Sequence, residues 1–226
     1  MPHAVNTGDT TEPEDIVDRD QTLAWVRDER LALADFFADL DEHEWHVDSL
    51  CSGWTVHEVL AHVTLSSTDT LWGTLVGIVR ARGDWNRMNA DQARNHAAQF
   101  TPAELIGQLR ESAGSARRAP GASPLDPLVD MVIHGQDVAR PLGRVREMPA
   151  EQACAALDHV LRSPFYGARK RLRGVRLTAT DAEWTGRNGA EEIRGPLSDL
   201  LLVATGRTAG LAALTGPGVE RVTAAL

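Results

Sequence analysis

The helix start at Thr55 constrains the fold more than any other feature of this chain. Thr55 and Glu58 match the T-x-x-E pattern of a capping box, and Trp54 and Val59 stand where the two apolar residues of a hydrophobic staple are expected. Apolar residues then recur at three- and four-residue steps to about residue 80, and Gly83 marks the end. We therefore predict a long amphipathic helix with one buried face.

Three more segments have the same helical period. One opens with a second capping box, Thr101 to Glu104, and has proline at its first helical position. Another opens at Asp126 and must end by Pro141. The four predicted helices cover about residues 20–40, 55–80, 101–118 and 126–141. The segment around Trp85 is predicted to be a linker, and four such helices indicate a bundle.

The pattern changes after Pro149. Period-two alternation indicates a strand, and a Gly-Arg-Asn-Gly run indicates a turn. The predicted elements are a helix over 150–163, a strand over 173–181, a turn at 186–189, a returning strand over 190–195, a short helix over 196–205 and a helical tail. Gly206 is expected to close the short helix.

These elements predict an α+β chain that is mainly α-helical. We expect three parts: a mobile acidic tail over residues 1–14, a four-helix metal-binding bundle over 15–148, and a small α+β C-terminal domain over 149–226.

Charge and hydropathy exclude several classes of protein. The net charge of −9 argues against nucleic acid or an anionic membrane surface as a partner. No apolar run approaches the roughly 18 residues of a membrane-spanning helix. The N-terminus has neither the basic nor the apolar region of a secretion signal. We therefore expect a cytoplasmic protein that is a monomer or a homodimer.

Two residue types inform on the environment of the chain. Cys51 and Cys154 are too few for a disulfide framework or a thiolate zinc site, so both are interpreted as packing residues. Lys170 is the only lysine, so nearly all basic residues are arginine. This bias is typical of a GC-rich genome and indicates an actinobacterium-like source.

A carboxylate and an imidazole share one face of the fourth predicted helix. Asp130 and His134 are four residues apart in an otherwise apolar stretch. Such groups are costly to bury unless they are paired or bound to a metal. The pair is compatible with a metal site and also with a simple Asp–His hydrogen bond. Asp137, one turn later, is predicted either to orient a ligand or to pair with Arg140.

The second predicted helix supplies another inward imidazole. His57 and His62 are five residues apart, about 140° beyond a full turn, so they cannot chelate one metal together. His62 lies on the apolar face, whereas His57 is expected to be solvated. A lone inward histidine is commonly a core residue, but three inward ligands from two helices are how bundles build metal sites. Two histidines and a carboxylate suit Zn²⁺, Fe²⁺, Mn²⁺ or Ni²⁺ and leave a coordination position open.

Two motifs resemble those of a known family. The sequence CSGWTVHEVLAHV is similar to the first motif of the mycothiol-dependent maleylpyruvate isomerase family, within the DinB-like helical superfamily. VDMVIHGQDVARPLG resembles the second metal motif of that family, and the segment from 178 to 216 resembles its small C-terminal domain. The resemblance covers nearly the whole chain after residue 20.

The resemblance implies a divalent metal, zinc first among the candidates, held by His62, Asp130 and His134. The family typically has glutamate where this chain has Asp130, which is shorter by one methylene. The resemblance also implies mycothiol, a low-molecular-weight thiol, as a cofactor. Arg187 and Arg207 are the candidates for catalytic groups that contact an acidic substrate.

The predicted chemistry is attack by a metal-bound thiolate on a small electrophile. A cis-enoyl diacid would be isomerised, whereas a substrate with a leaving group or a strained ring would be conjugated, as in an S-transferase. Two alternatives stay open: a non-catalytic protein that binds a metal or small ligand, and a metal-free interaction module.

Overall fold

The computed structural model describes residues 19–66, 85–118 and 121–226. The predicted acidic tail and the second half of the second predicted helix lie outside these residues. In the described part, the elements in chain order are α1 (Arg19–Ala38), η1 (Glu42–His46), α2 (Val56–Leu65), α4 (Trp85–Ala97), α5 (Pro102–Glu111), α6 (Asp126–Ala139), α7 (Ala150–Arg162), α8 (Ala168–Arg171), β1 (Val175–Ala179), β2 (Thr185–Gly186), β3 (Glu191–Gly195), α9 (Leu197–Ala204), η2 (Thr208–Ala213) and α10 (Val219–Thr223).

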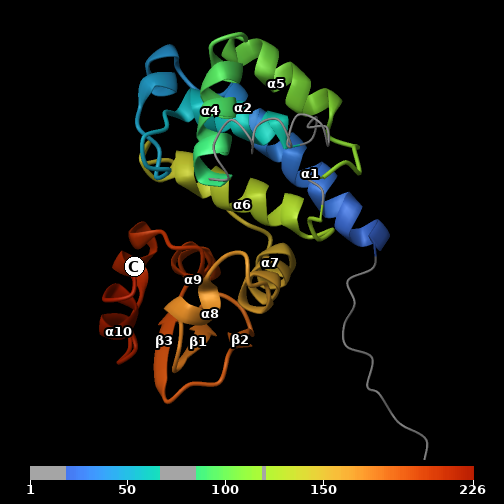
Figure 1. Ribbon diagram of the computed structural model, residues 1–226. Coiled ribbons are helices and arrows are strands. Elements are labelled where there is room, and N and C mark those ends of the chain that lie inside the picture. Colours follow the sequence, from blue (N-terminus) through green and yellow to red (C-terminus); the bar gives the residue numbers. More distant parts are fainter. Residues whose placement is uncertain (1–18, 67–84, 119–120) are drawn as a thin grey trace, which may run out of the picture.

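The N-terminal helices form a bundle in which α1, α2, α5 and α6 pack side by side, with α4 against α2 (Figure 1). Both predicted capping boxes are present, at Thr55 on α2 and at Thr101 on α5. One core cluster fills this bundle, and it includes Leu33, Phe37, Trp45, Val59, Leu60, Leu105, Leu109, Met131 and Val138. These side chains hold α2 against α6, the two helices that matter for the site.

The prediction of a linker around Trp85 is wrong, because that residue begins the α4 helix. The helix is rich in polar residues, so its sequence lacks the apolar stripe that marks the other four. It is recognised only by its packing, which brings it into extensive contact with α2.

The C-terminal part packs below α6 as seen in Figure 1. A second core cluster joins Leu128 and Val132 of α6 to apolar residues of α7, the sheet and α9. Since this cluster takes side chains from both sides of residue 149, the division into domains at that point stays a prediction.

The small sheet has the order β2-β1-β3 and corrects one expectation. The segment over 190–195 forms a strand, but β3 runs parallel to β1 in the register Leu177↔Ile193. The antiparallel neighbour of β1 is the two-residue β2. Between β2 and β3 the chain passes back to the start of β1, where Gly189 packs so closely on Gly174 that a Cβ would lie 2.4 Å from its backbone.

No helix in the described residues is both long and apolar enough to cross a membrane.

Candidate metal centre

Three predicted ligands converge between α2 and α6. Nε2 of His134 lies 3.3 Å from Oδ1 of Asp130, and Nε2 of His62 lies 3.5 Å from the same oxygen. The three donor atoms all lie within 4.8 Å of one another. Donors about 3.3 Å apart match the edges of a tetrahedron around a metal with bonds of ~2.0–2.1 Å. The donor set therefore fits a divalent cation in composition and in spacing.

The helical geometry explains why these residues meet. Asp130 and His134 are one turn apart on α6, so their side chains share a face. His62 is in the last turn of α2, which the Thr55 capping box starts at a fixed residue. The side chains are mostly buried but still reach solvent, with exposed fractions of 17% for His62, 26% for Asp130 and 12% for His134. A ligand from solvent can thus approach the cluster.

Electrostatics show that the cluster favours a positive charge between its donors. Burial alone would raise the pKa of Asp130, but the charge of His62 and a hydrogen bond with His134 hold that pKa well below its usual value. Burial would lower the pKa of His134, yet the neighbouring Cys51 sulfur and hydrogen bonds with Asp130 and Asp137 raise it well above 6.5. A divalent cation between the donors would place its positive charge beside the same carboxylate.

Asp137 lies behind His134 and fixes its ring. Nδ1 of His134 lies 2.9 Å from Oδ2 of Asp137, whose side chain is fully buried. An imidazole that donates its Nδ1–H to a carboxylate presents a more basic Nε2 to a metal. The predicted orienting role of Asp137 agrees with this contact, and the alternative pair with Arg140 does not form, since Arg140 binds Asp199 instead.

Cys51 contacts the same group, which the sequence interpretation as a packing residue missed. Its thiol donates to Oδ2 of Asp137 at 3.1 Å, and its sulfur lies 3.4 Å from Nδ1 of His134. The backbone N–H of Leu50 donates to the carbonyl of Asp137 and so docks the Cys51 loop on α6. No sequence spacing relates residues 51 and 134, so this contact was beyond pattern reasoning.

Trp54 covers the two imidazoles. Its ring is edge-on to His62 at 5.1 Å between centroids and roughly parallel to His134 at 6.4 Å. Trp54, one of the two residues of the predicted hydrophobic staple, therefore packs on both imidazoles of the candidate site. His57, by contrast, faces away from the cluster, but it is not simply solvated, because its Nε2 lies 3.2 Å from the carbonyl of Phe100.

The two arginines predicted to contact substrate occupy different places. Arg207 reaches from the C-terminal part to Asp137, with Nε 3.1 Å from Oδ1 and Nη2 2.7 Å from Oδ2. The two N–H groups of Arg207 that could bind a substrate carboxylate are therefore already bonded to Asp137. Arg187 has a left-handed backbone (φ 63°) in the connection between β2 and β3.

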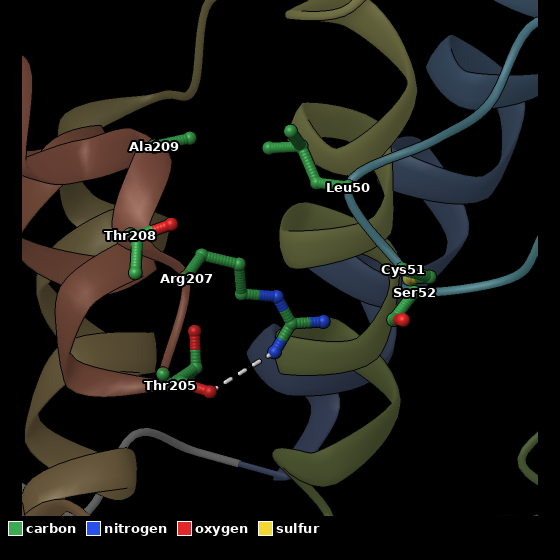
Figure 2. Close-up of a pocket in the computed structure, with 8 residues that line it drawn as sticks. Leu50, Cys51, Ser52, Thr205, Arg207, Thr208 and Ala209 are labelled. Atoms are coloured by element: carbon green, nitrogen blue, oxygen red, sulfur yellow. Dashed lines mark hydrogen bonds between the residues drawn. The ribbon is translucent and has the colours of Figure 1, made fainter. Parts of the chain in front are cut away.

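A cavity of about 300 Å³ separates the Cys51 loop from the C-terminal part. Figure 2 shows Arg207 extending across it toward Cys51 and Ser52, with its Nη1 bonded to the Thr205 carbonyl. Cys51 lines this cavity and contacts Nδ1 of His134. The other ring nitrogen of His134, Nε2, is the one that faces Asp130 and the candidate metal position.

The bundle, the small α+β part and the His–Asp–His cluster define a helical-bundle protein with a candidate metal site between α2 and α6. The family model described as "Mycothiol maleylpyruvate isomerase N-terminal domain" matches residues 26–151, which is more than half of the chain. The chain therefore belongs to this family, and the predicted fold class is confirmed.

Solved structures support the fold over most of the chain. A crystal structure of the mycothiol-dependent maleylpyruvate isomerase is 15% identical and has a TM-score of 0.61, with 90% of this chain and 94% of that chain covered. A structure of a histidine-to-alanine mutant of that isomerase has the same identity and coverage and a TM-score of 0.55. At this identity the likeness shows the fold alone. No curated protein sequence matches.

Proposed function

We propose that this protein is a metal- and mycothiol-dependent enzyme that adds a thiolate to a small electrophile, as an isomerase or an S-transferase. The observation that carries the proposal is the convergence of His62, Asp130 and His134, whose donor atoms span one metal position. The mycothiol requirement is inferred from family membership.

Each residue of the cluster has a defined task in this proposal. His62, Asp130 and His134 would hold the metal and leave a coordination position free. Zinc is the first candidate, although Ni²⁺, Fe²⁺ and Mn²⁺ also suit these ligands. A bound divalent metal lowers the pKa of a coordinating thiol and so supplies a nucleophilic sulfur at neutral pH.

The surrounding residues prepare the site. Asp137 keeps the ring of His134 in place through Nδ1, and Arg207 holds Asp137. Trp54 packs on the two imidazoles and would limit the access of water on that side. The cavity beside Cys51 offers room for part of a small molecule next to the cluster. The reaction would take place in the cytoplasm of an actinobacterium-like cell, where such a thiol is kept reduced.

The proposal is tested by mycothiol conjugation to a generic electrophile, with zinc-loaded protein. We expect the wild type to accelerate conjugation and His134→Ala to abolish the acceleration. His57→Ala is the matched control, because His57 is on α2 but faces away from the cluster, and it should retain the wild-type rate. Equal rates for wild type and His134→Ala would contradict the catalytic role.

The alternative of a non-catalytic metal-binding protein gives a different result. In that case the wild type would retain metal and His134→Ala would lose it, yet neither protein would accelerate conjugation.

A further inference from the structure

Arg207 binds a residue of the bundle with the edge of its guanidinium that recognises carboxylates. Its Nε donates to Oδ1 of Asp137 at 3.1 Å, and its Nη2 donates to Oδ2 at 2.7 Å. The third nitrogen, Nη1, donates to the Thr205 carbonyl at 3.2 Å. Because Asp137 also contacts Nδ1 of His134, a single side chain connects Arg207 to a candidate metal ligand.

The orientation of the Asp137 carboxylate decides whether it can hold the imidazole. Its side chain is fully buried, and Oδ2 lies 2.9 Å from Nδ1 of His134. Rotation of the carboxylate about its last side-chain bond is soft and would turn Oδ2 away from the ring. Arg207 binds both oxygens at once, and a two-point pair fixes the plane of a carboxylate as well as its position. Arg207 therefore keeps Oδ2 aligned with Nδ1.

The pair between Arg207 and Asp137 also joins two regions of the chain. Arg207 directly precedes η2 in the C-terminal part, whereas Asp137 lies on α6 of the bundle. A second two-point pair crosses this boundary in the opposite direction, from Arg140 on the bundle to Asp199 on α9, at 2.7 and 3.0 Å. Both carboxylates are buried, but Asp137 is the one bonded to a histidine of the candidate site. The two pairs are thus a natural matched set for experiment.

We propose that Arg207 is a positioning residue for the metal centre, acting through Asp137 and His134, so that metal affinity depends on the docking of the C-terminal part. This inference rests on the proposed function and adds regulation of the same site to it. When the segment before η2 leaves the bundle, Asp137 loses its two-point partner, and the ring of His134 is no longer held at Nδ1. This role differs from the substrate contact that the sequence predicts for Arg207.

The first measurement is zinc affinity, by competition with a chromophoric chelator. We expect Arg207→Gln to weaken zinc binding by about 10-fold, at the low end of the range for residues that support metal ligands, because Asp137 itself remains. Arg140→Gln is the matched control and should keep the wild-type affinity. Each variant leaves one buried carboxylate without its arginine, so urea unfolding should show similar losses of stability.

The second measurement follows the ring of His134 directly. In zinc-loaded protein with 15N-labelled histidine, the Nδ1–H proton bonded to Asp137 should give a slowly exchanging signal in NMR spectra. We expect this signal in the wild type and in Arg140→Gln, and faster exchange with water in Arg207→Gln. Arg207→Lys serves if Arg207→Gln does not fold. A lysine keeps the charge but cannot form the two-point pair, so it should recover only part of the zinc affinity.

The outcomes separate this inference from the proposed function. Wild-type zinc affinity in a folded Arg207→Gln protein would overturn it, as would wild-type affinity in Arg207→Lys if only that variant folds. Equal losses of affinity in Arg207→Gln and Arg140→Gln would also overturn it, because the effect would then be a general loosening of the fold. Zinc binding that depends on Arg207, in a protein that does not accelerate thiol conjugation, would instead contradict the proposed function and support this inference.

Discussion

At the scale of single residues, Asp137 is the residue that links three other side chains of the candidate site. Its carboxylate accepts from His134, Cys51 and Arg207, and its side chain is fully buried. Hydrogen bonds from His134 and Arg207 hold the pKa of Asp137 well below its usual value, although burial alone would raise it. The carboxylate is therefore charged at neutral pH and can orient the imidazole.

We expect Asp137→Asn to weaken zinc affinity by about 10–100-fold, because His134 loses a charged partner at Nδ1. Competition with a chromophoric chelator measures the affinity. Asp199→Asn is the matched control, since Asp199 is also buried and also pairs with an arginine, Arg140, but does not touch a histidine. Equal losses of zinc affinity in both variants would show that the effect is a general loss of stability.

A glycine on α6 leaves room for a buried ion pair. A Cβ on Gly135 would lie 2.6 Å from Nη1 and 2.9 Å from Cζ of Arg146, whose Nη2 is 2.7 Å from Glu29. Gly135→Ala should therefore destabilise the fold by about 1–3 kcal/mol, as overpacking does.

Gly107, in the α5 helix, provides the contrast. A Cβ there meets nothing within 4 Å, so Gly107→Ala should stabilise the fold by roughly 0.5–1 kcal/mol. Urea unfolding of both variants gives the free energies of unfolding. A Gly135→Ala protein as stable as the wild type would contradict the close packing of Arg146 on Gly135, and a less stable Gly107→Ala protein would contradict the open space at Gly107.

At the scale of elements, Asp126 ties α6 to α7 and to the segment that follows it. Its Oδ1 accepts from Nε2 of His159 at 2.7 Å and from the Tyr166 hydroxyl at 2.8 Å. Burial would raise the pKa of Asp126, but these bonds lower it below 3.8. A carboxyl with a depressed folded-state pKa stabilises the fold above its unfolded pKa, and the contribution is lost as the pH falls through the folded value.

We therefore expect the stability difference between wild type and Asp126→Asn to be constant from neutral pH down to about pH 5, and to shrink below about pH 4. Free energies of unfolding at a series of pH values measure it. Asp35→Asn, which removes a charge at an exposed pair, controls for the change in net charge. A difference that grew as the pH fell would contradict the assigned role of Asp126.

The helices that begin with a capping box in the sequence were predictable, whereas the α4 helix, which has neither a cap nor an apolar stripe, was not. The capping boxes at Thr55 and Thr101 mark helix starts in sequence and structure alike. The α4 helix was missed because its residues are mostly polar, and its packing on α2 is a tertiary property. At the site, the His134–Asp137 contact follows from helical spacing. The contacts of Cys51 and Arg207 with Asp137 depend on how distant segments dock, which no periodicity encodes.

At the scale of the whole molecule, buried ion pairs join the bundle to the C-terminal part. Arg140 of the bundle binds Asp199 of α9, and Arg207 binds Asp137 of α6 in return. The candidate site is thus completed by side chains from both parts. The parallel pairing of β3 with β1 was not predictable for a similar reason, since a turn signal specifies a change of direction but not the strand that the chain then joins.

Metal content after dialysis against zinc, measured by mass spectrometry, tests the central claim most directly. We predict one zinc ion per chain for the wild type and for His57→Ala, and none for His62→Ala or His134→Ala. Because His57 and His62 are both on α2, comparing these two variants distinguishes zinc bound at the specific site from zinc bound nonspecifically by histidine side chains. Equal zinc content in wild type and His62→Ala, or no zinc in the wild type, would contradict the metal centre.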